Sequence, residues 1–350
     1  MMGRRITLIG ALLVVVGVAA ASAAGGGHGY AWHLTPTGTA ARLRGVSAIS
    51  ATTAWASGSL GTVVRTVDGG ATWQQVGPPG TSSLQFRDIE AFDADHAAIL
   101  SIGTGTAARV YVTSNGGQTW TQTFTNTDPN AFYDCMTFFN DRRGLALSDP
   151  VNGKFRIIAT SDGGQSWHVV SPAGMPAALP DEFAFAASGQ CIVTDHGRRA
   201  WFGSGGAAQA RVFRSDDGGN TWSVSATPLN SGPSAGIFAL AFNGQQHGLA
   251  VGGDFATPAA SPDMLASTSD GGAGWSLVAD APNEYRSGAA WVTGHDAVAV
   301  GPTGSDASFD RGETWQRFDS GSFDTVDCAN PNACWASGEG GRAAHLVRTH

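Results

Sequence analysis

The side chains in this sequence that could do chemistry together are arginines and carboxylates near the start of successive β-like units. Aligning the units places seven residues near the same end of their first strands: Arg44, Arg87, Asp134, Glu182, Ile237, Ser287 and Asp324. Arg286 lies one residue from that position. Arginines bind carboxylates through paired hydrogen bonds, and two carboxyl groups can act as acid and base on a glycosidic bond. The same residues could instead neutralise one another around a structural pore, so three interpretations are open.

A glycoside hydrolase would need two carboxyl groups at a defined separation. The candidates near the predicted channel are Asp88, Asp134, Glu182 and Glu284. A sialidase would also need three arginines around the substrate carboxylate. Phe155-Arg156-Ile157 resembles only part of the arginine motif of those enzymes. Hydrolysis is therefore the alternative to binding without catalysis.

Other motifs do not support metal or cofactor chemistry. The nine histidines form no HExxH motif and no close Cys/His cluster, so we expect no metal site. Residues 232–236 fit the pattern GxSxG, but no helical pattern follows them. We find no strand-turn-helix unit for a dinucleotide, and we expect no cofactor.

A motif that recurs six times, close to (S/T)xDxGx(T/S)W, indicates the elements that must position these groups. Each copy lies between two β-like runs, as in residues 155–160 and 167–170, so each is predicted to be a hairpin turn. Glycine allows positive φ, the Asp or Asn side chain can cap backbone N–H groups, and Trp covers the hairpin. We call these turns Asp boxes. Their marker residues are Asp68 and Trp73, Asn115 and Trp120, Asp162 and Trp167, Asp217 and Trp222, Asp270 and Trp275, and Asp310 and Trp315.

The spacing of the boxes predicts an all-β, seven-bladed propeller. Successive box tryptophans are 40 to 55 residues apart, which is typical of repeat architectures. The sequence stops where a seventh box would begin, whereas residues 31–34 resemble the strand that follows a box. We therefore expect the N-terminal strand to complete the last blade, which leaves only short sheet edges.

The N-terminus has the composition of a secretory signal. Two arginines precede an apolar run over residues 6–21, and a small-residue site follows at residues 21–23. We expect residues 1–23 to be the signal and residues 24–350 to be the propeller. An uncleaved anchor is the alternative, although the run is short for a membrane span. The protein is then periplasmic or secreted, with no stable membrane span after cleavage.

Composition limits the kind of partner. Glycine makes up 49 of 350 residues, which favours many tight turns, and charged residues make up only 14%. Removal of Arg4 and Arg5 with the signal leaves 18 basic and 28 acidic residues, a formal charge of −10. A chain with that balance is not expected to bind nucleic acid.

Four cysteines are consistent with an exported protein. Cys328 and Cys334 flank a short hairpin and are expected to form a disulfide. Cys135 is assigned near the start of an inner strand and Cys191 to the second strand of the next blade. These positions would lie at opposite ends of the propeller, so no bond between them is expected.

A binding site is expected on the face opposite the Asp boxes. Strands alternate in direction, so the starts of the inner strands share one face with the loops between second and third strands. Those loops are predicted to be enlarged at residues 148–154, 197–209 and 252–266. The second of them would expose Trp201 and Phe202 beside Arg44, Arg87 and Arg286, a combination suited to a protein partner.

The boxes and inner strands such as Phe86-Arg87-Asp88-Ile89 resemble bacterial relatives of the photosystem II stability and assembly factor family, over essentially the whole mature chain. Similar boxes occur in sialidases and other glycoside hydrolases, so they indicate the architecture better than the activity. The resemblance implies an exported, non-catalytic propeller that binds a protein or peptide of the cell envelope through arginines, and we expect the protein to be a monomer. Arg44, Arg87 and Arg286 are the candidates for that role. The interspersed carboxylates depart from the family's basic patch.

Overall fold

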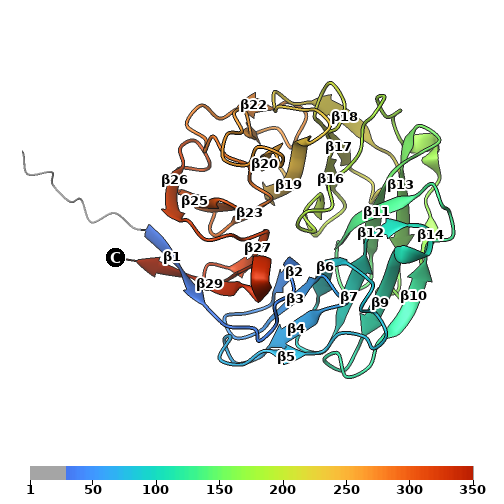
Figure 1. The fold of residues 1–350 in the computed structure, drawn as a ribbon. Coiled ribbons are helices and arrows are strands. Elements are labelled where there is room, and N and C mark those ends of the chain that lie inside the picture. Colours follow the sequence, from blue (N-terminus) through green and yellow to red (C-terminus); the bar gives the residue numbers. More distant parts are fainter. Residues whose placement is uncertain (1–28, 350) are drawn as a thin grey trace, which may run out of the picture.

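The computed structural model describes residues 29–349 as a ring of seven antiparallel sheets (Figure 1). The predicted signal, residues 1–23, lies outside the described residues. Each sheet has four strands, which follow one another from the centre of the ring outward. A short fifth strand, β8 (Gly103–Thr104), is added beside β11 in the third sheet. The predicted all-β, seven-bladed propeller is therefore confirmed.

The strands follow one another around the ring in sequence order. The innermost strands are β2 (Leu43–Ala48), β6 (Phe86–Ala91), β11 (Phe132–Phe138), β15 (Ile192–Thr194), β19 (Ala235–Asn243), β23 (Gly288–Trp291) and β27 (Thr325–Asn330). The second strands are β3 (Ala54–Gly58), β7 (Ala97–Ser101), β12 (Gly144–Val151), β16 (Ala200–Gly203), β20 (His247–Asp254), β24 (Ala297–Gly301) and β28 (Ala333–Ser337).

The outer half of each blade carries the strands on either side of the box turn. The third strands are β4 (Val63–Thr66), β9 (Arg109–Thr113), β13 (Lys154–Thr160), β17 (Arg211–Ser215), β21 (Leu265–Thr268), β25 (Gly304–Ser308) and β29 (Ala343–Thr349). The outermost strands are β5 (Gln74–Gln75), β10 (Thr121–Thr125), β14 (His168–Val169), β18 (Ser223–Ala226), β22 (Ser276–Leu277), β26 (Gln316–Asp319) and β1 (Gly29–Leu34). The short helices are η1 (Gly105–Ala107), η2 (Pro172–Gly174) and η3 (Glu339–Gly341).

The two ends of the described chain meet in the seventh sheet. β1 pairs antiparallel with β29, with Trp32 opposite Leu346 and Gly29 opposite Thr349. Figure 1 shows the blue first strand beside the red last strand. The ring is thus closed by hydrogen bonds between strands from opposite ends of the sequence. Closure of this kind leaves only short sheet edges at the outside of the blades.

The box turns are held by their own side chains. In the first box an Asp68 carboxylate oxygen accepts a hydrogen bond from the Thr72 N–H at 2.9 Å, and the Thr66 hydroxyl accepts one from the Gly70 N–H at 2.9 Å. Gly69 and Gly70 have φ of 76° and 81°. Hydrogen bonds from Thr72 hold the pKa of Asp68 below its usual range. The corresponding residue accepts from the backbone four residues later in the other five boxes: Asn115, Asp162, Asp217, Asp270 and Asp310.

The fourth blade differs from the sequence-based assignment. Its inner strand is β15, whereas the sequence analysis placed that strand about ten residues earlier, beginning near Glu182. The predicted loop over residues 197–209 therefore contains β16. The predicted loop over residues 148–154 is instead the tight end of a long hairpin between β12 and β13, and only residues 255–264 form an extended connection of the kind expected.

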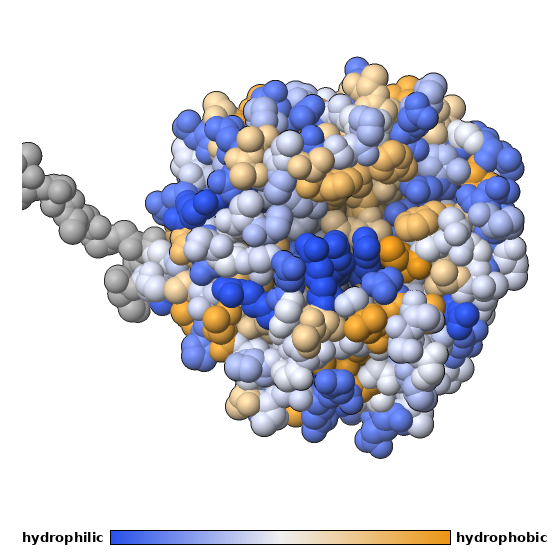
Figure 2. Space-filling view, viewed as in Figure 1, coloured by the Kyte–Doolittle hydropathy of each residue, from blue (hydrophilic) through white to orange (hydrophobic). Residues whose placement is uncertain are grey.

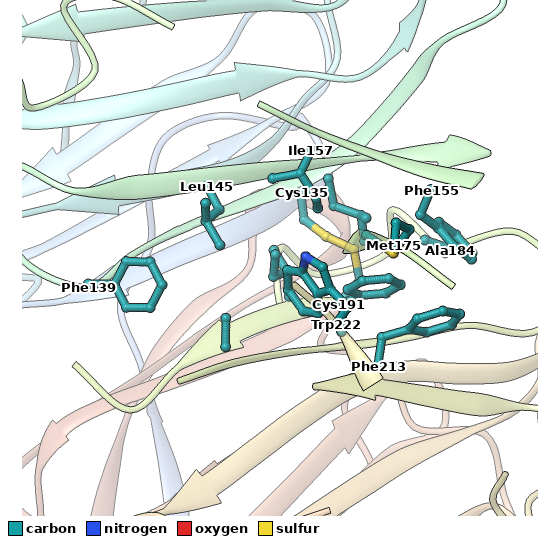
Figure 3. Close-up of a cluster of buried hydrophobic side chains, with 14 residues drawn as sticks. Cys135, Phe139, Leu145, Phe155, Ile157, Met175, Ala184, Cys191, Phe213 and Trp222 are labelled. Atoms are coloured by element: carbon teal, nitrogen blue, oxygen red, sulfur yellow. A yellow bond between two sulfur atoms is a disulfide. The ribbon is translucent and has the colours of Figure 1, made fainter. Parts of the chain in front are cut away.

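This shift also corrects the prediction for Cys135 and Cys191, which form a disulfide with a Cα–Cα distance of 6.2 Å. Cys191 directly precedes the inner strand β15, not a second strand, and Cys135 lies on the neighbouring inner strand β11. Figure 3 shows their bond among buried side chains that include Met175, Phe213 and Trp222. The second disulfide joins Cys328 and Cys334 across the hairpin of the seventh blade, as expected.

Candidate functional site

The centre of the ring is filled by residues 183–190, which we call the central segment. It replaces the early part of an inner strand in the fourth blade and enters the middle of the ring as a yellow-green loop in Figure 1. Gln190 fastens it to two blades on the far side: the side-chain amide donates to the carbonyls of Ala289 at 3.0 Å and Val326 at 2.8 Å. The Gln190 side-chain oxygen accepts a hydrogen bond from the Ala289 N–H at 3.0 Å.

Two predicted arginines hold the same segment from the first and second blades. Arg87 donates to the Ala186 carbonyl at 2.7 Å, and Arg44 to the Ala187 carbonyl at 3.4 Å. Within residues 29–349, neither arginine forms an ion pair with a carboxylate. Burial lowers the pKa of Arg87 to about 10 and also lowers the pKa of Arg44. Both remain cationic at neutral pH, so they form a half-buried positive pair without a direct ion-pair partner among the described residues.

Asp134 forms a carboxyl pair with Asp149, a residue that was not among the predicted site residues. Burial raises the pKa of both groups, and the Asp149 charge raises that of Asp134 further. The pKa of Asp149 reaches about 7. Asp149 accepts a hydrogen bond from the Ala184 N–H of the central segment at 2.8 Å, whereas one Asp134 oxygen is buried without a partner among the described residues.

The other predicted acidic positions are occupied by ion pairs. Asp324 is 1% exposed and accepts two hydrogen bonds from Arg42, at 2.6 and 2.7 Å. Glu182 accepts from Arg211 Nε at 2.8 Å and from the Ser204 hydroxyl at 2.6 Å. Arg42 directly precedes β2 and lies two residues before Arg44, so its closeness in sequence was the available signal.

Arg286 is not part of a surface, which corrects the sequence-based assignment. Its side chain is fully buried, and its guanidinium donates to Asp306 at 2.7 Å and to the Tyr285 carbonyl at 2.9 Å. Glu284 contacts the same guanidinium and pairs with Arg317 at 2.5 Å. Arg286 therefore neutralises carboxylates within the sixth blade and cannot contact a partner in this conformation.

Trp201 and Phe202 are also buried, because they lie on β16 and not on an exposed loop. Trp201 stacks on Phe242 with ring centroids 3.8 Å apart, and Phe202 stacks on Phe213 at 4.4 Å. Phe255, from the long connection after β20, is the aromatic residue that this face does expose, at 50%. Its ring lies 6.3 Å from Phe185 of the central segment.

The four carboxyl groups considered for hydrolysis are not gathered into one site. Glu182 and Glu284 are held by separate arginines, in the fourth and sixth blades. Asp134 lies beside Asp149, and Asp88 lines a chamber whose floor includes Gly189 of the central segment. Among these residues, the structure brings Arg44, Arg87 and Asp134 together around the central segment. Figure 2 shows strongly hydrophilic residues at the centre of the ring, directly beside hydrophobic ones.

Residues 29–349 contain neither a membrane-spanning helix nor a cluster of metal ligands. No helix in this part of the chain is long and apolar enough to cross a membrane. No group of three or more His, Cys, Asp or Glu side chains is arranged there to hold a metal ion.

Comparison with known proteins gives structural likenesses at low sequence identity. No protein-family model matches the chain, and no curated protein matches it. A structure of YCF48 bound to D1 peptide superposes with a TM-score of 0.63 at 16% identity, covering 90% of this chain and 96% of that one. YCF48 from Cyanidioschyzon merolae gives 0.63 at 15% identity, covering 91% and 99%. The GH74 xyloglucanase from Xanthomonas campestris gives 0.65 at 16% identity, covering 90% of this chain but 53% of the enzyme. The chain thus has the seven-bladed propeller fold that YCF48, a photosystem II assembly factor, shares with a GH74 enzyme, and likenesses at this identity establish the fold alone.

Proposed function

We propose that this protein is a non-catalytic binding propeller that docks a protein or peptide on the face opposite the Asp boxes. The observation that carries the proposal is the half-buried pair Arg44 and Arg87, which has no carboxylate partner among the described residues. An acidic side chain or a terminal carboxylate of a partner would supply the missing charge, and guanidinium groups bind carboxylates well.

An aromatic cluster beside the arginines supplies apolar contact on the same face. Phe185 stacks on Phe238 at 3.9 Å, and the exposed Phe255 packs edge-on against both rings. The next two residues of the central segment, Ala186 and Ala187, receive the hydrogen bonds from the two arginines. A peptide with an acidic and an apolar residue could therefore contact charge and aromatic surface together. The YCF48 structure solved with a D1 peptide supports a peptide as the kind of partner.

A selection with displayed random peptides tests this function. Peptides selected on the full chain are measured against a double variant, Arg44→Gln with Arg87→Gln, and against Phe255→Ser. We expect the arginine variant to weaken binding by about tenfold or more, since hydrogen bonds to charged groups contribute about 1.5–3 kcal/mol, and Phe255→Ser to weaken it through lost apolar contact. Arg142→Gln with Arg198→Gln removes two exposed charges on the box face and is the matched control. Equal affinity for the site and control variants would refute the docking face.

A second candidate is a glycoside hydrolase, and the Asp134–Asp149 pair is the observation that favours it. Two carboxyl groups with raised pKa values, one about 7, are the kind of pair that acid–base chemistry uses. Screening sialic-acid and β-glucan substrates tests it. Turnover that is lost in Asp134→Asn would replace the binding proposal.

We further propose that the protein is exported as a monomer to the periplasm or the medium. The sequence pattern of residues 1–23 supports export, and two disulfides in the described chain suit an oxidising compartment. N-terminal sequencing of the protein from fractionated cells tests the cleavage site, and light scattering tests the monomer.

A further inference from the structure

A chamber of about 460 Å³ lies in the channel on the side of the central segment away from the arginine pair. Ser188, Gly189 and Gln190 of the central segment form its floor. Its walls include the last residues of inner strands, such as Ala48 and Ala91, so it opens on the Asp-box face. This volume is within the range of small-molecule sites.

One wall of the chamber carries three carboxyl groups and no arginine or lysine. They are Asp88, Glu90 and Asp327. Asp88 accepts a hydrogen bond from the Met136 N–H at 2.6 Å, and Asp327 accepts one from the Ala48 N–H at 2.8 Å. These bonds join neighbouring inner strands, so the two aspartates have structural partners. The Glu90 carboxyl group has no side-chain hydrogen bond and no ion pair with any residue in the part of the chain that is described.

A hydroxyl group on the chamber wall also lacks a partner among the described residues. Thr137 is only 6% exposed, lines the chamber, and forms no side-chain hydrogen bond within residues 29–349. Buried polar groups are normally satisfied by protein, water or ligand. An unpartnered hydroxyl and an unpartnered carboxyl group in one enclosed space therefore point to a polar occupant.

The opposite wall carries no charged side chain. Leu240, Ala241, Phe242, Ala290 and Trp291 line it. His196 is the remaining ionisable group of the lining and lies at the exposed mouth. An occupant that suits the chamber therefore has positive charge toward one wall and an aliphatic body toward the other.

We infer that this chamber binds a small aliphatic amine, such as a diamine or a lysine-like side chain. Burial and then the charges of Asp88 and Asp327 raise the pKa of Glu90, and a bound ammonium group would oppose that shift by favouring the charged carboxylate, which would then serve as its counter-ion. A bare metal ion is disfavoured, because no group of three ligands is arranged to hold one in the described chain. A small anion would face three carboxyl groups and no arginine or lysine.

Calorimetric titration of the full chain with cadaverine tests this assignment. We expect saturable binding, weakened by about tenfold or more in Glu90→Gln, which removes the unpartnered charge at nearly constant shape. Thr137→Val should weaken binding less, because it removes one neutral hydrogen-bond partner. Glu313→Gln removes the same charge from an exposed box turn and should leave the affinity unchanged.

Proton release gives a second readout that a merely structural role would not produce. Because carboxyl groups with raised pKa values bind protons in the free chamber, binding of an ammonium group should displace them. The measured binding heat should then differ between two buffers with different heats of ionisation, and less so in Glu90→Gln.

Three results would overturn the inference. They are absence of saturable binding, equal affinity of Glu90→Gln and the parent chain, and equal affinity for the uncharged diol of the same chain length. Thermal unfolding of each variant shows whether it is folded, and Thr137→Val provides an independent test if Glu90→Gln is not.

Discussion

The two disulfides should differ in how much they stabilise the propeller. Cys135 and Cys191 are 56 residues apart in sequence, whereas Cys328 and Cys334 are 6 apart. A disulfide stabilises chiefly by restricting the unfolded chain, and the restriction grows with the logarithm of the closed loop. The chain-entropy relation gives about 4 kcal/mol for the longer loop and about 2 kcal/mol for the shorter one.

Paired alanine variants measure this difference. The double change Cys135→Ala with Cys191→Ala should lower the free energy of unfolding by about twice as much as Cys328→Ala with Cys334→Ala. The first pair also loses buried packing, because Cys135 and Cys191 lie in the cluster around Trp222. Cys334 is also buried, whereas Cys328 is only partly so, so packing should widen the difference.

The assay is equilibrium unfolding in guanidinium chloride, read by tryptophan fluorescence and by circular dichroism, with oxidised parent protein as reference. Parent protein reduced before unfolding provides the control, since reduction opens both loops without changing side-chain volume elsewhere. The reasoning would be refuted if the variant without Cys328–Cys334 lost as much stability as the other, because loop length would then not set the effect.

Three further changes test individual contacts. Arg286→Met should lower the free energy of unfolding by about 3–5 kcal/mol, because it removes the cation that is bonded to the buried Asp306. Arg317 is exposed, so Arg317→Met should lower it by under about 1 kcal/mol. Chemical denaturation of the two variants measures the difference. Gln190→Ala should cost about 2–4 kcal/mol for three lost hydrogen bonds, with the exposed Gln75→Ala as control in the same assay. Asp149 has a folded-state pKa raised to about 7, so the folded protein holds its proton more tightly than the unfolded chain. The stability that Asp149 contributes is full at pH values below its unfolded pKa and is lost as the pH rises toward 7. Asp149→Asn should therefore flatten that part of the curve of unfolding free energy against pH. An unchanged curve would contradict the raised pKa of Asp149.

Local chemistry made the architecture predictable from sequence. A box turn needs an Asp or Asn, glycines with positive φ and a covering tryptophan within eight residues, so each copy could be recognised without its neighbours. The count of seven followed from strand-like residues at both ends, and the pairing of Trp32 with Leu346 agrees with it. The Cys328–Cys334 bond was equally local, because one hairpin places both residues together.

The centre of the ring was decided by tertiary structure. The sequence pattern predicts a strand over this segment, but residues 183–190 fill the channel because Gln190 finds backbone partners at Ala289 and Val326, which are 99 and 136 residues away in the sequence. Because these residues fill the channel, the strands of the fourth blade begin later in the sequence than predicted. Trp201 is therefore buried on the second strand, and Cys191 lies beside Cys135. Charge partners such as Asp306 for Arg286 were likewise set by packing within a folded blade. Sequence by itself therefore determined the repeated turns and the closure of the ring, whereas which charged groups are free to bind depends on contacts between residues that only folding brings together.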